Sequence, residues 1–182
     1  MSTNVKILFA TDSLISENAT VKDFVKNSPA GHCSVLLEGT HYIVVKESKK
    51  TPITLEKVRS TAGNIARDLS GRKVEAAEVS AEVLTDGFAE LANNDLLTAF
   101  AEGWDLGAYQ FVAYKPSVTA FKTTLVVEGD AEEQDSVSLG KNRADATSFS
   151  RDLMNELSNV LNPETFPEVL KQQFEGTGVE VN

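Results

Sequence analysis

Hydrophobic residues change their spacing several times along the chain, and each change predicts a new element. The run from Val5 to Ala10 is short, apolar-rich and partly β-branched, which predicts a buried strand. Thr11-Asp12-Ser13 follows it as a turn or cap. Val21, Phe24 and Val25 then recur at the spacing of one helix face, so we expect a short helix that ends at Asn27–Gly31.

Two short apolar runs come next and predict a β-hairpin. They are Val35–Leu37 and His41–Lys46, and Gly39-Thr40 separates them. A hairpin at this point would place two antiparallel strands early in the sheet.

The two strongest periodic patterns predict amphipathic helices. The first has apolar residues about one turn apart, at Leu55, Val58, Ala62, Ile65, Ala66 and Leu69. Thr54 is expected to cap its start, and Gly71 to end it in the left-handed conformation. The second is a two-column stripe of Leu96, Leu97, Phe100, Ala101 and Trp104. A β-rich run follows each helix and predicts a strand, at Val74–Val79 and Phe121–Val127.

The carboxyl-terminal part predicts two more helices. One runs from about Val137 or Lys141 to about Glu156, with Phe149, Leu153 and Leu157 one turn apart. The other is expected to start at Asn162-Pro163, a cap followed by a first-turn proline. Its apolar face would be Phe166, Val169, Leu170 and Phe174. Val179–Val181 then looks like the beginning of a strand.

Strands and helices alternate along most of the chain. This alternation indicates an α/β fold with three layers, in which helices cover both faces of a mixed sheet. We expect that domain to be complete by about residue 145, and the strand at Val179–Val181 to belong to a second domain in which the chain stops.

Composition narrows the possible partners. The formal net charge is −10, and the densest basic spot, Lys46–Lys50, holds only three lysines together with Glu47, which argues against nucleic-acid binding. The single cysteine, Cys33, excludes an internal disulfide and agrees with a reducing cytoplasm. Residues Met1–Asn18 lack a secretory pattern, and no apolar run could span a bilayer. We therefore expect a cytoplasmic protein with no membrane partner.

Few residues are candidates for metal binding, catalysis or phosphate binding. His32, Cys33 and His41 are the only soft-ligand candidates, and an adjacent His-Cys pair without two further ligands does not make a tetrahedral site. Cys33 with His41 as its base is also disfavoured, because the two can face opposite ways on a hairpin. The acidic run Glu128–Asp135, including the adjacent Glu132 and Glu133, is interpreted as a solvated loop that leads into a helix rather than as a metal site. Gly176-Thr177-Gly178 follows a helix, so it is not a phosphate loop.

Two stretches carry a family resemblance. Ser150–Leu161 with Asn162-Pro163-Glu164 resembles the linker of the leucyl (cytosol) aminopeptidase family, through Arg151, Asp152, Leu153, Asn155, Asn159, Leu161 and Pro163. Leu157 stands where that family commonly has proline, so this linker helix is expected to run a little further.

The second stretch, Glu102–Lys115, is similar to the end of the family's amino-terminal domain. Its matching residues are Gly103, Leu106, Gly107, Tyr109, Phe111 and Lys115. Gly103 and Gly107 are expected to allow close packing of a helix on the sheet. The resemblance covers roughly residues 55–182, with a looser match around Gly63.

The resemblance implies a macro-domain-like amino-terminal domain over 1–145, a linker helix over 146–161 and the start of a catalytic domain over 162–182. The family removes amino-terminal residues from peptides with two divalent metals, zinc or manganese, which its carboxyl-terminal domain holds. The family's catalytic signature is absent here, so we assign no catalytic, metal-ligating or cofactor-binding residue. The implied partners are the chain's own catalytic domain and further copies in a hexamer. A macro-like module that binds a nucleotide or ADP-ribose is the alternative.

Overall fold

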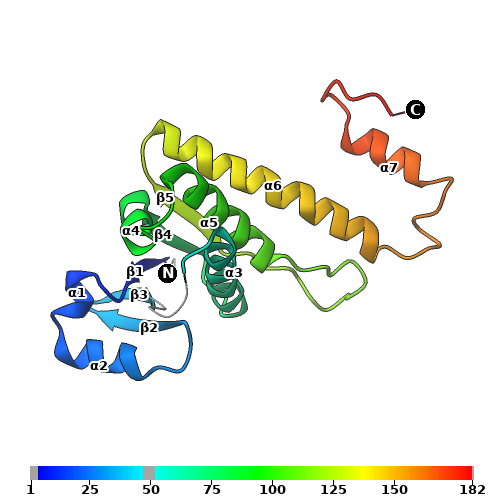
Figure 1. Ribbon diagram of the computed structural model, residues 1–182. Coiled ribbons are helices and arrows are strands. Elements are labelled where there is room, and N and C mark those ends of the chain that lie inside the picture. The colour runs from blue at the N-terminus through cyan, green and yellow to red at the C-terminus, as the bar shows by residue number, and fades with distance from the viewer. Residues whose placement is uncertain (1–3, 47–51, 182) are drawn as a thin grey trace. The chain divides into compact units, whose positions relative to one another are not determined.

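The computed structural model describes residues 4–46 and 52–181. It forms two compact units, Met1–Asp145 and Ala146–Asn182. The first unit is built around a sheet (Figure 1). The sheet has five strands: β1 (Asn4–Phe9), β2 (His32–Leu37), β3 (Thr40–Val45), β4 (Ala76–Ser80) and β5 (Thr124–Glu128).

The sheet is mixed, as the sequence predicts. Its order is β2-β3-β1-β4-β5. The pairs β1–β3, β1–β4 and β4–β5 are parallel, and only β2–β3 is antiparallel. The predicted hairpin is confirmed, but its turn is Glu38-Gly39. Both residues have a positive φ, 48° and 81°, as a tight two-residue hairpin turn requires.

Helices cover both faces of the sheet, to different extents. One face packs against α3 (Leu55–Gly71) and α5 (Asn93–Ala108), and it receives Val5, Ile7 and Phe9 of β1. The other face is covered by α1 (Ser13–Ser16) and α2 (Ala19–Asn27) over β3 and its neighbours, around buried Ile15, Val25 and Val44. Figure 1 shows α1 and α2 across the sheet from α3. Over β4 and β5 this second face carries Glu78 and exposed Val126 and Glu128.

The spacing of apolar residues does not predict two short helices, α1 and α4 (Ala81–Gly87). Asp12 caps α1 by accepting a hydrogen bond from the backbone of Leu14 at 2.9 Å. Ser80 likewise caps α4, through the backbone N–H of Val83. Helices of one or two turns contain too few apolar repeats to show a period, so their caps are their main signal.

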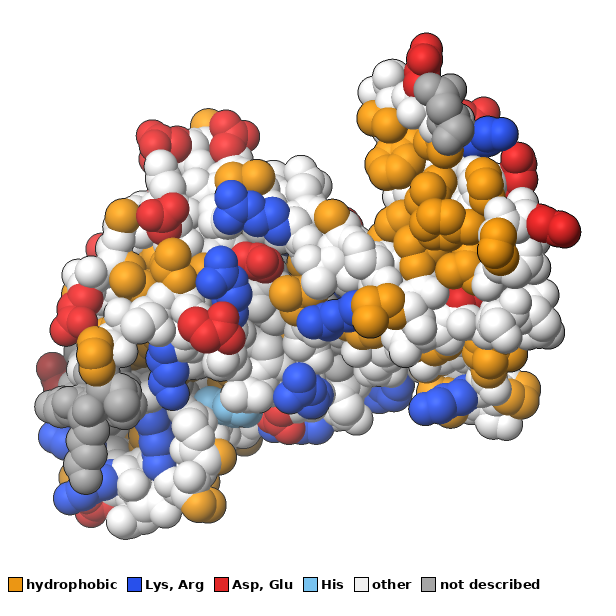
Figure 2. All heavy atoms as spheres, turned by 45° about the vertical axis from the view of Figure 1, so that its right-hand side comes forward, with side chains coloured by type: hydrophobic (Ala, Val, Ile, Leu, Met, Phe, Trp, Pro, Cys, Tyr) orange, Lys and Arg blue, Asp and Glu red, His pale blue; other side chains and the backbone are white. Residues whose placement is uncertain are grey.

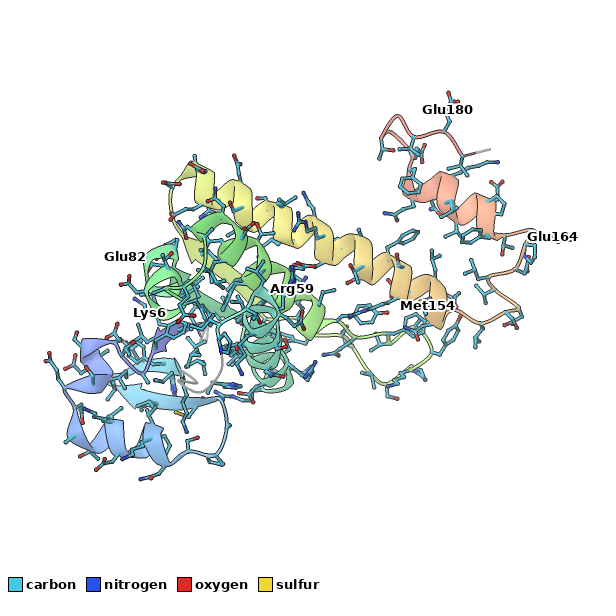
Figure 3. All side chains as sticks on the ribbon, in the orientation of Figure 1. Lys6, Arg59, Glu82, Met154, Glu164 and Glu180 are labelled. Carbon is cyan, nitrogen blue, oxygen red and sulfur yellow. The ribbon has the colours of Figure 1, made fainter. Side chains whose placement is uncertain are left out.

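The prediction that Gly103 and Gly107 pack a helix against the sheet is wrong. These glycines lie on α5 and face α3. A Cβ atom on Gly107 would lie 2.2 Å from Gly63 Cα, and one on Gly103 would lie 2.4 Å from the backbone oxygen of Arg59. The two helices therefore approach backbone to backbone. Beside this contact lies Arg59, which is labelled in Figure 3. Its Nε donates to Glu102 Oε2 at 2.8 Å.

Helix α3 begins as predicted, with the Thr54 side chain accepting from the backbone of Lys57. The prediction that Gly71 ends it in the left-handed conformation is wrong, because Lys73 takes that role with φ 60°. The backbone N–H of Val74 reaches Leu69 O at 3.1 Å, and that of Lys73 reaches Ser70 O at 3.2 Å. This is a Schellman motif, and it buries Leu69 and Val74 together.

The long helix α6 (Ala131–Asn155) starts earlier than predicted. The acidic run does lead into a helix start, as expected, but it is not all loop: Glu128 ends β5, and Glu132 and Glu133 lie in the first turn of α6. Asp130 Oδ1 accepts from the backbone of Glu133, and Glu133 Oε2 accepts from the backbone of Asp130. This reciprocal capping box satisfies two helix-end donors, which explains why acids gather at this point.

The second unit contains the end of α6 and α7 (Phe166–Gln173). Helix α6 ends at Asn155, close to the predicted end at about Glu156. The expectation that it runs a little further is wrong, because the backbone N–H groups of Val160 and Leu161 bond to Leu157 O in a separate turn. The predicted start of the last helix is also too early, because Asn162 caps a preceding turn through the backbone of Glu164 and Thr165. Residues 179–181 form no strand.

We expect Gly107→Ala to destabilise the chain by about 1–3 kcal/mol, the usual range for forcing a methyl group into a packed interior. The reason is the collision of the new Cβ with the backbone of Gly63. Gly71→Ala is the matched control, because a Cβ there meets nothing within 4 Å. Urea unfolding should place the control within about 1 kcal/mol of the parent chain. Equal stability of both variants would contradict the backbone contact.

Candidate functional site

The parallel strands end together at one edge of the sheet, and β1 lies at its centre. Strands β1 and β3 end at Phe9 and Val45, and β4 ends at Ser80. The chain passes from β1 toward β2 and β3 on one side, and then to β4 on the other. Such a reversal of strand order leaves a crevice outside the carboxyl ends, which is where open α/β sheets bind ligands.

A pocket of about 530 Å³ lies beside this edge, between the end of β1, the end of β3 and the helices α1 and α2. Its size falls in the range of small-molecule sites. Two chemical types line it, an apolar and hydroxyl-bearing part and a cationic part. The lining residues are Ala10, Thr11, Ile15, Ser16, Lys22, Val25, Lys26 and Lys46.

The cationic part comes from two elements. Lys22 and Lys26 lie one turn apart on α2, whose start is capped by the Asn18 side chain. Lys46 follows β3, and its ammonium group donates to the backbone oxygens of Lys26 and Ser28 at the end of α2. These bonds bring the third positive charge to the helix end that carries Lys26, where a cation also complements the helix dipole.

A second pocket of about 450 Å³ adjoins the same strand end and has the opposite charge. It shares Thr11 with the first pocket and contains Asp12 and Asp86. The Asp12 carboxylate is already engaged as the cap of α1. The edge of the sheet is thus divided between a cationic and an anionic compartment.

The soft-ligand candidates are not brought together. Cys33 pairs with Val44 in the hairpin ladder, whereas His41 pairs with Leu36. Cys33 packs on the face of Val44, and His41 belongs to the alternate set of positions on β3, so the two lie on opposite faces. His32 Nε2 lies 3.5 Å from Asp68 of α3. Within residues 4–46 and 52–181, no three His, Cys, Asp or Glu side chains are grouped to hold a metal.

The other sequence candidates have structural roles. Glu133 closes the capping box of α6 and also accepts from Asn93, while Glu132 accepts from Asn94 at 2.7 Å, so both tie α6 to the start of α5. Gly176 and Gly178 have positive φ values after α7, in a turn and not at the start of a helix. No helix in the described part of the chain is long and apolar enough to cross a membrane.

Two curated proteins, both named "Probable cytosol aminopeptidase", match most of the chain. The one from Aquifex aeolicus is 30% identical over 141 residues, which are 75% of this chain and 27% of the relative. The one from Treponema denticola is 32% identical over 139 residues, which are 73% of this chain and 28% of the relative. This chain belongs to the cytosol aminopeptidase family. It spans little more than a quarter of these relatives' length and corresponds to their amino-terminal part.

Solved structures agree on the fold of this family. "Bottromycin maturation enzyme BotP in complex with Mn" superposes with a TM-score of 0.74 at 20% identity, over 99% of this chain and 38% of that one. A tomato leucine aminopeptidase mutant gives 0.66 at 14% identity, over 96% and 39%. No protein-family profile matches the chain. The predicted resemblance and the mixed α/β fold class are confirmed.

We expect the Cys33 thiol to react more slowly than a free thiol. Burial raises its pKa, and the nearby Lys46 charge and a hydrogen bond with Ser28 offset only part of that effect. Less thiolate is then present at any pH below the folded-state pKa. The rate of iodoacetamide labelling, measured as a function of pH, should have its midpoint at a higher pH for the native chain than for the chain unfolded in guanidinium chloride. A native midpoint equal to or below the unfolded one would contradict this environment.

Proposed function

We propose that this chain is the non-catalytic amino-terminal domain of a two-metal leucyl aminopeptidase, whose complete protein removes amino-terminal residues from peptides. The observation that carries the proposal is the extent of the match. Most of this chain aligns with cytosol aminopeptidases, yet it accounts for only 27% and 28% of their length.

The chemistry of the described residues supports this division of roles. Hydrolysis with two metals needs several carboxylate or similar ligands around one cavity. No such group exists within residues 4–46 and 52–181. We place the two divalent metals, zinc or manganese, in the catalytic part of the complete protein. Manganese is named with the BotP structure.

A role in assembly is supported by the surface of the second unit. Figure 2 shows orange side chains gathered on the part of the surface that this unit forms. None of the residues of α7 is buried. Met154, labelled in Figure 3, is 85% exposed. Other large apolar side chains of the unit are also exposed: Leu157, Val160, Phe166 and Val179. Apolar surface of this extent normally faces a partner.

We assign that surface to contact with the catalytic domain, with residues 146–161 as the linker and 162–182 as the start of that domain. Further copies of the complete protein would then assemble into a hexamer, in which the amino-terminal domains shape access to the active sites. The net charge of −10 argues against a polyanionic partner.

The 182-residue chain should not hydrolyse leucine p-nitroanilide, with or without added Mn²⁺, because its described part offers no group of metal ligands. A complete cytosol aminopeptidase assayed with the same metal is the positive control. Turnover above background that a chelator abolishes would refute the non-catalytic role.

Replacing Leu157, Val160 and Phe166 by serine should lower the fluorescence of the apolar dye ANS bound to the chain. These side chains are 47%, 47% and 39% exposed, so the far-ultraviolet circular dichroism should change little. The control replaces exposed Tyr114 and Val118 of the first unit in the same way. An equal loss of fluorescence in the control would show that the second unit is not the main apolar surface.

A further inference from the structure

The outermost strand β2 leaves one side of its backbone without a partner strand. It pairs only with β3, in an antiparallel ladder at the end of the sheet (Figure 1). Hydrogen-bonded and non-hydrogen-bonded pairs alternate along such a ladder. The bond from Lys46 N to Gly31 O shows that the pair just before β2 is hydrogen-bonded. Alternate residues of the strand, which are His32, Ser34 and Leu36, therefore direct their backbone N–H and C=O groups away from β3.

These outward backbone groups remain available. No hydrogen bond from another described element reaches them. Helix α3 contacts only the side chains of this edge: Asp68 lies 3.5 Å from His32 Nε2, and Arg72 donates to the Ser34 hydroxyl at 2.6 Å. Asp68 and Arg72 also pair with each other at 3.3 Å. Together they add no net charge, so they do not repel a neutral strand that approaches the edge.

The two edges of the sheet differ in protection. Native proteins protect edge strands with charged residues, proline, bulges or a covering element. At β5, Gln134 donates to the edge carbonyl of Val127. Strand β2 has the sequence HCSVLL, which contains no Lys, Arg, Asp, Glu or Pro, and no bulge interrupts its register with β3. Leu36 within it is 59% exposed. An edge of this kind is a template for another strand.

A second copy of β2 is complementary to this edge. A two-fold axis at Ser34 pairs this residue with its own copy, and His32 with Leu36 of the second copy. This is the one antiparallel register that uses all three outward residues, each in a pair that exchanges two backbone hydrogen bonds. On the face toward α2, the same register sets Cys33 opposite Val35. Both side chains pack partly buried on the core of α1 and α2, so this apolar row would continue across the axis.

We propose that β2 is a self-association surface, at which two copies of this chain join into one continuous sheet with five strands from each copy. The surface is distinct from the exposed apolar side chains of the second unit. The inference goes beyond the proposed function and does not rest on it, because the contact needs neither metals nor a catalytic domain.

Sedimentation velocity combined with amide hydrogen exchange tests the proposal on the 182-residue chain. We expect the mass to rise from monomer to dimer with concentration, and the exchange of the His32, Ser34 and Leu36 amides to slow at the same time. A chain that stays monomeric would overturn the proposal. Association without slower exchange of these three amides would also overturn it, and would point to the second unit as the contact.

Two matched variants assign the contact to the edge. Leu36→Lys places a charge where the second copy would pair, and it should raise the dimer Kd by about tenfold or more. Leu139→Lys is the control, because this leucine of α6 is also exposed, at 46%, and lies away from the edge. It should leave the Kd unchanged. Circular dichroism should show intact folds for both, since both leucines are exposed. Equal effects of the two variants would overturn the assignment.

Val35→Cys tests the register independently. The introduced thiol would face Cys33 of the second copy in a non-hydrogen-bonded pair, with Cα atoms about 4.5 Å apart, which is within disulfide range. Oxidation with diamide should then yield a covalent dimer. In a chain that also carries Cys33→Ser, the two introduced thiols are out of register, so the covalent dimer should be lost. Absence of cross-linking in the first variant, or equal cross-linking in both, would overturn the proposed pairing.

Discussion

The backbone contact between α3 and α5 is the constraint on which the rest of the first unit depends. Three glycines allow it, because a methyl group on Gly107 or Gly103 would collide with the backbone of the facing helix. A close approach of this kind fixes the position of α5 along α3 more tightly than interchangeable apolar side chains would. The ion pair of Arg59 with Glu102 then has a defined place beside it, at 2.8 Å. Gly140 allows a second close approach of the same kind, between α6 and α5, because a Cβ atom at Gly140 would lie 2.3 Å from Thr98 O.

The position of α5 in turn sets the edge strand of the sheet. Buried Trp104 donates through its ring nitrogen to Thr123 O at 2.9 Å, just before β5 begins. Thr123 also donates through its hydroxyl to Val74 O and through its backbone to the Ser70 hydroxyl. Every polar group in this buried cluster therefore has a partner, as buried polar groups need. Gln134 of α6 donates to Val127 O on the same strand, which occupies an edge carbonyl that another chain could otherwise pair with.

The sequence predicts the periodic elements well and the local ones poorly. Helices α3 and α5 and strand β1 are visible because many apolar residues repeat in each, and burial of those residues determines the element. Helices α1 and α4 depend on single caps, at Asp12 and Ser80, and the start of α6 on the pair Asp130 and Glu133. The glycines in α5 are visible in the sequence, but their partner is not, since it lies on a helix some forty residues earlier. The lysine pocket is hidden for the same reason: residues 10–16, 22–26 and 46 meet only after the sheet has formed.

Two uncovered surfaces differ in what they require. The face of the sheet over β4 and β5 is open but polar: Lys6 is exposed there (Figure 3), and Asn4 Nδ2 donates to Glu78 Oε1 at 2.9 Å. Such a face is stable in water without a partner. The second unit instead exposes Leu157, Val160 and Val179, each about half accessible, and its helix α7 buries none of its residues. Burying such side chains gains roughly 25 cal/mol for each Å² of apolar surface. Covering the apolar side chains of the second unit would therefore stabilise an association more than covering the polar face of the sheet would.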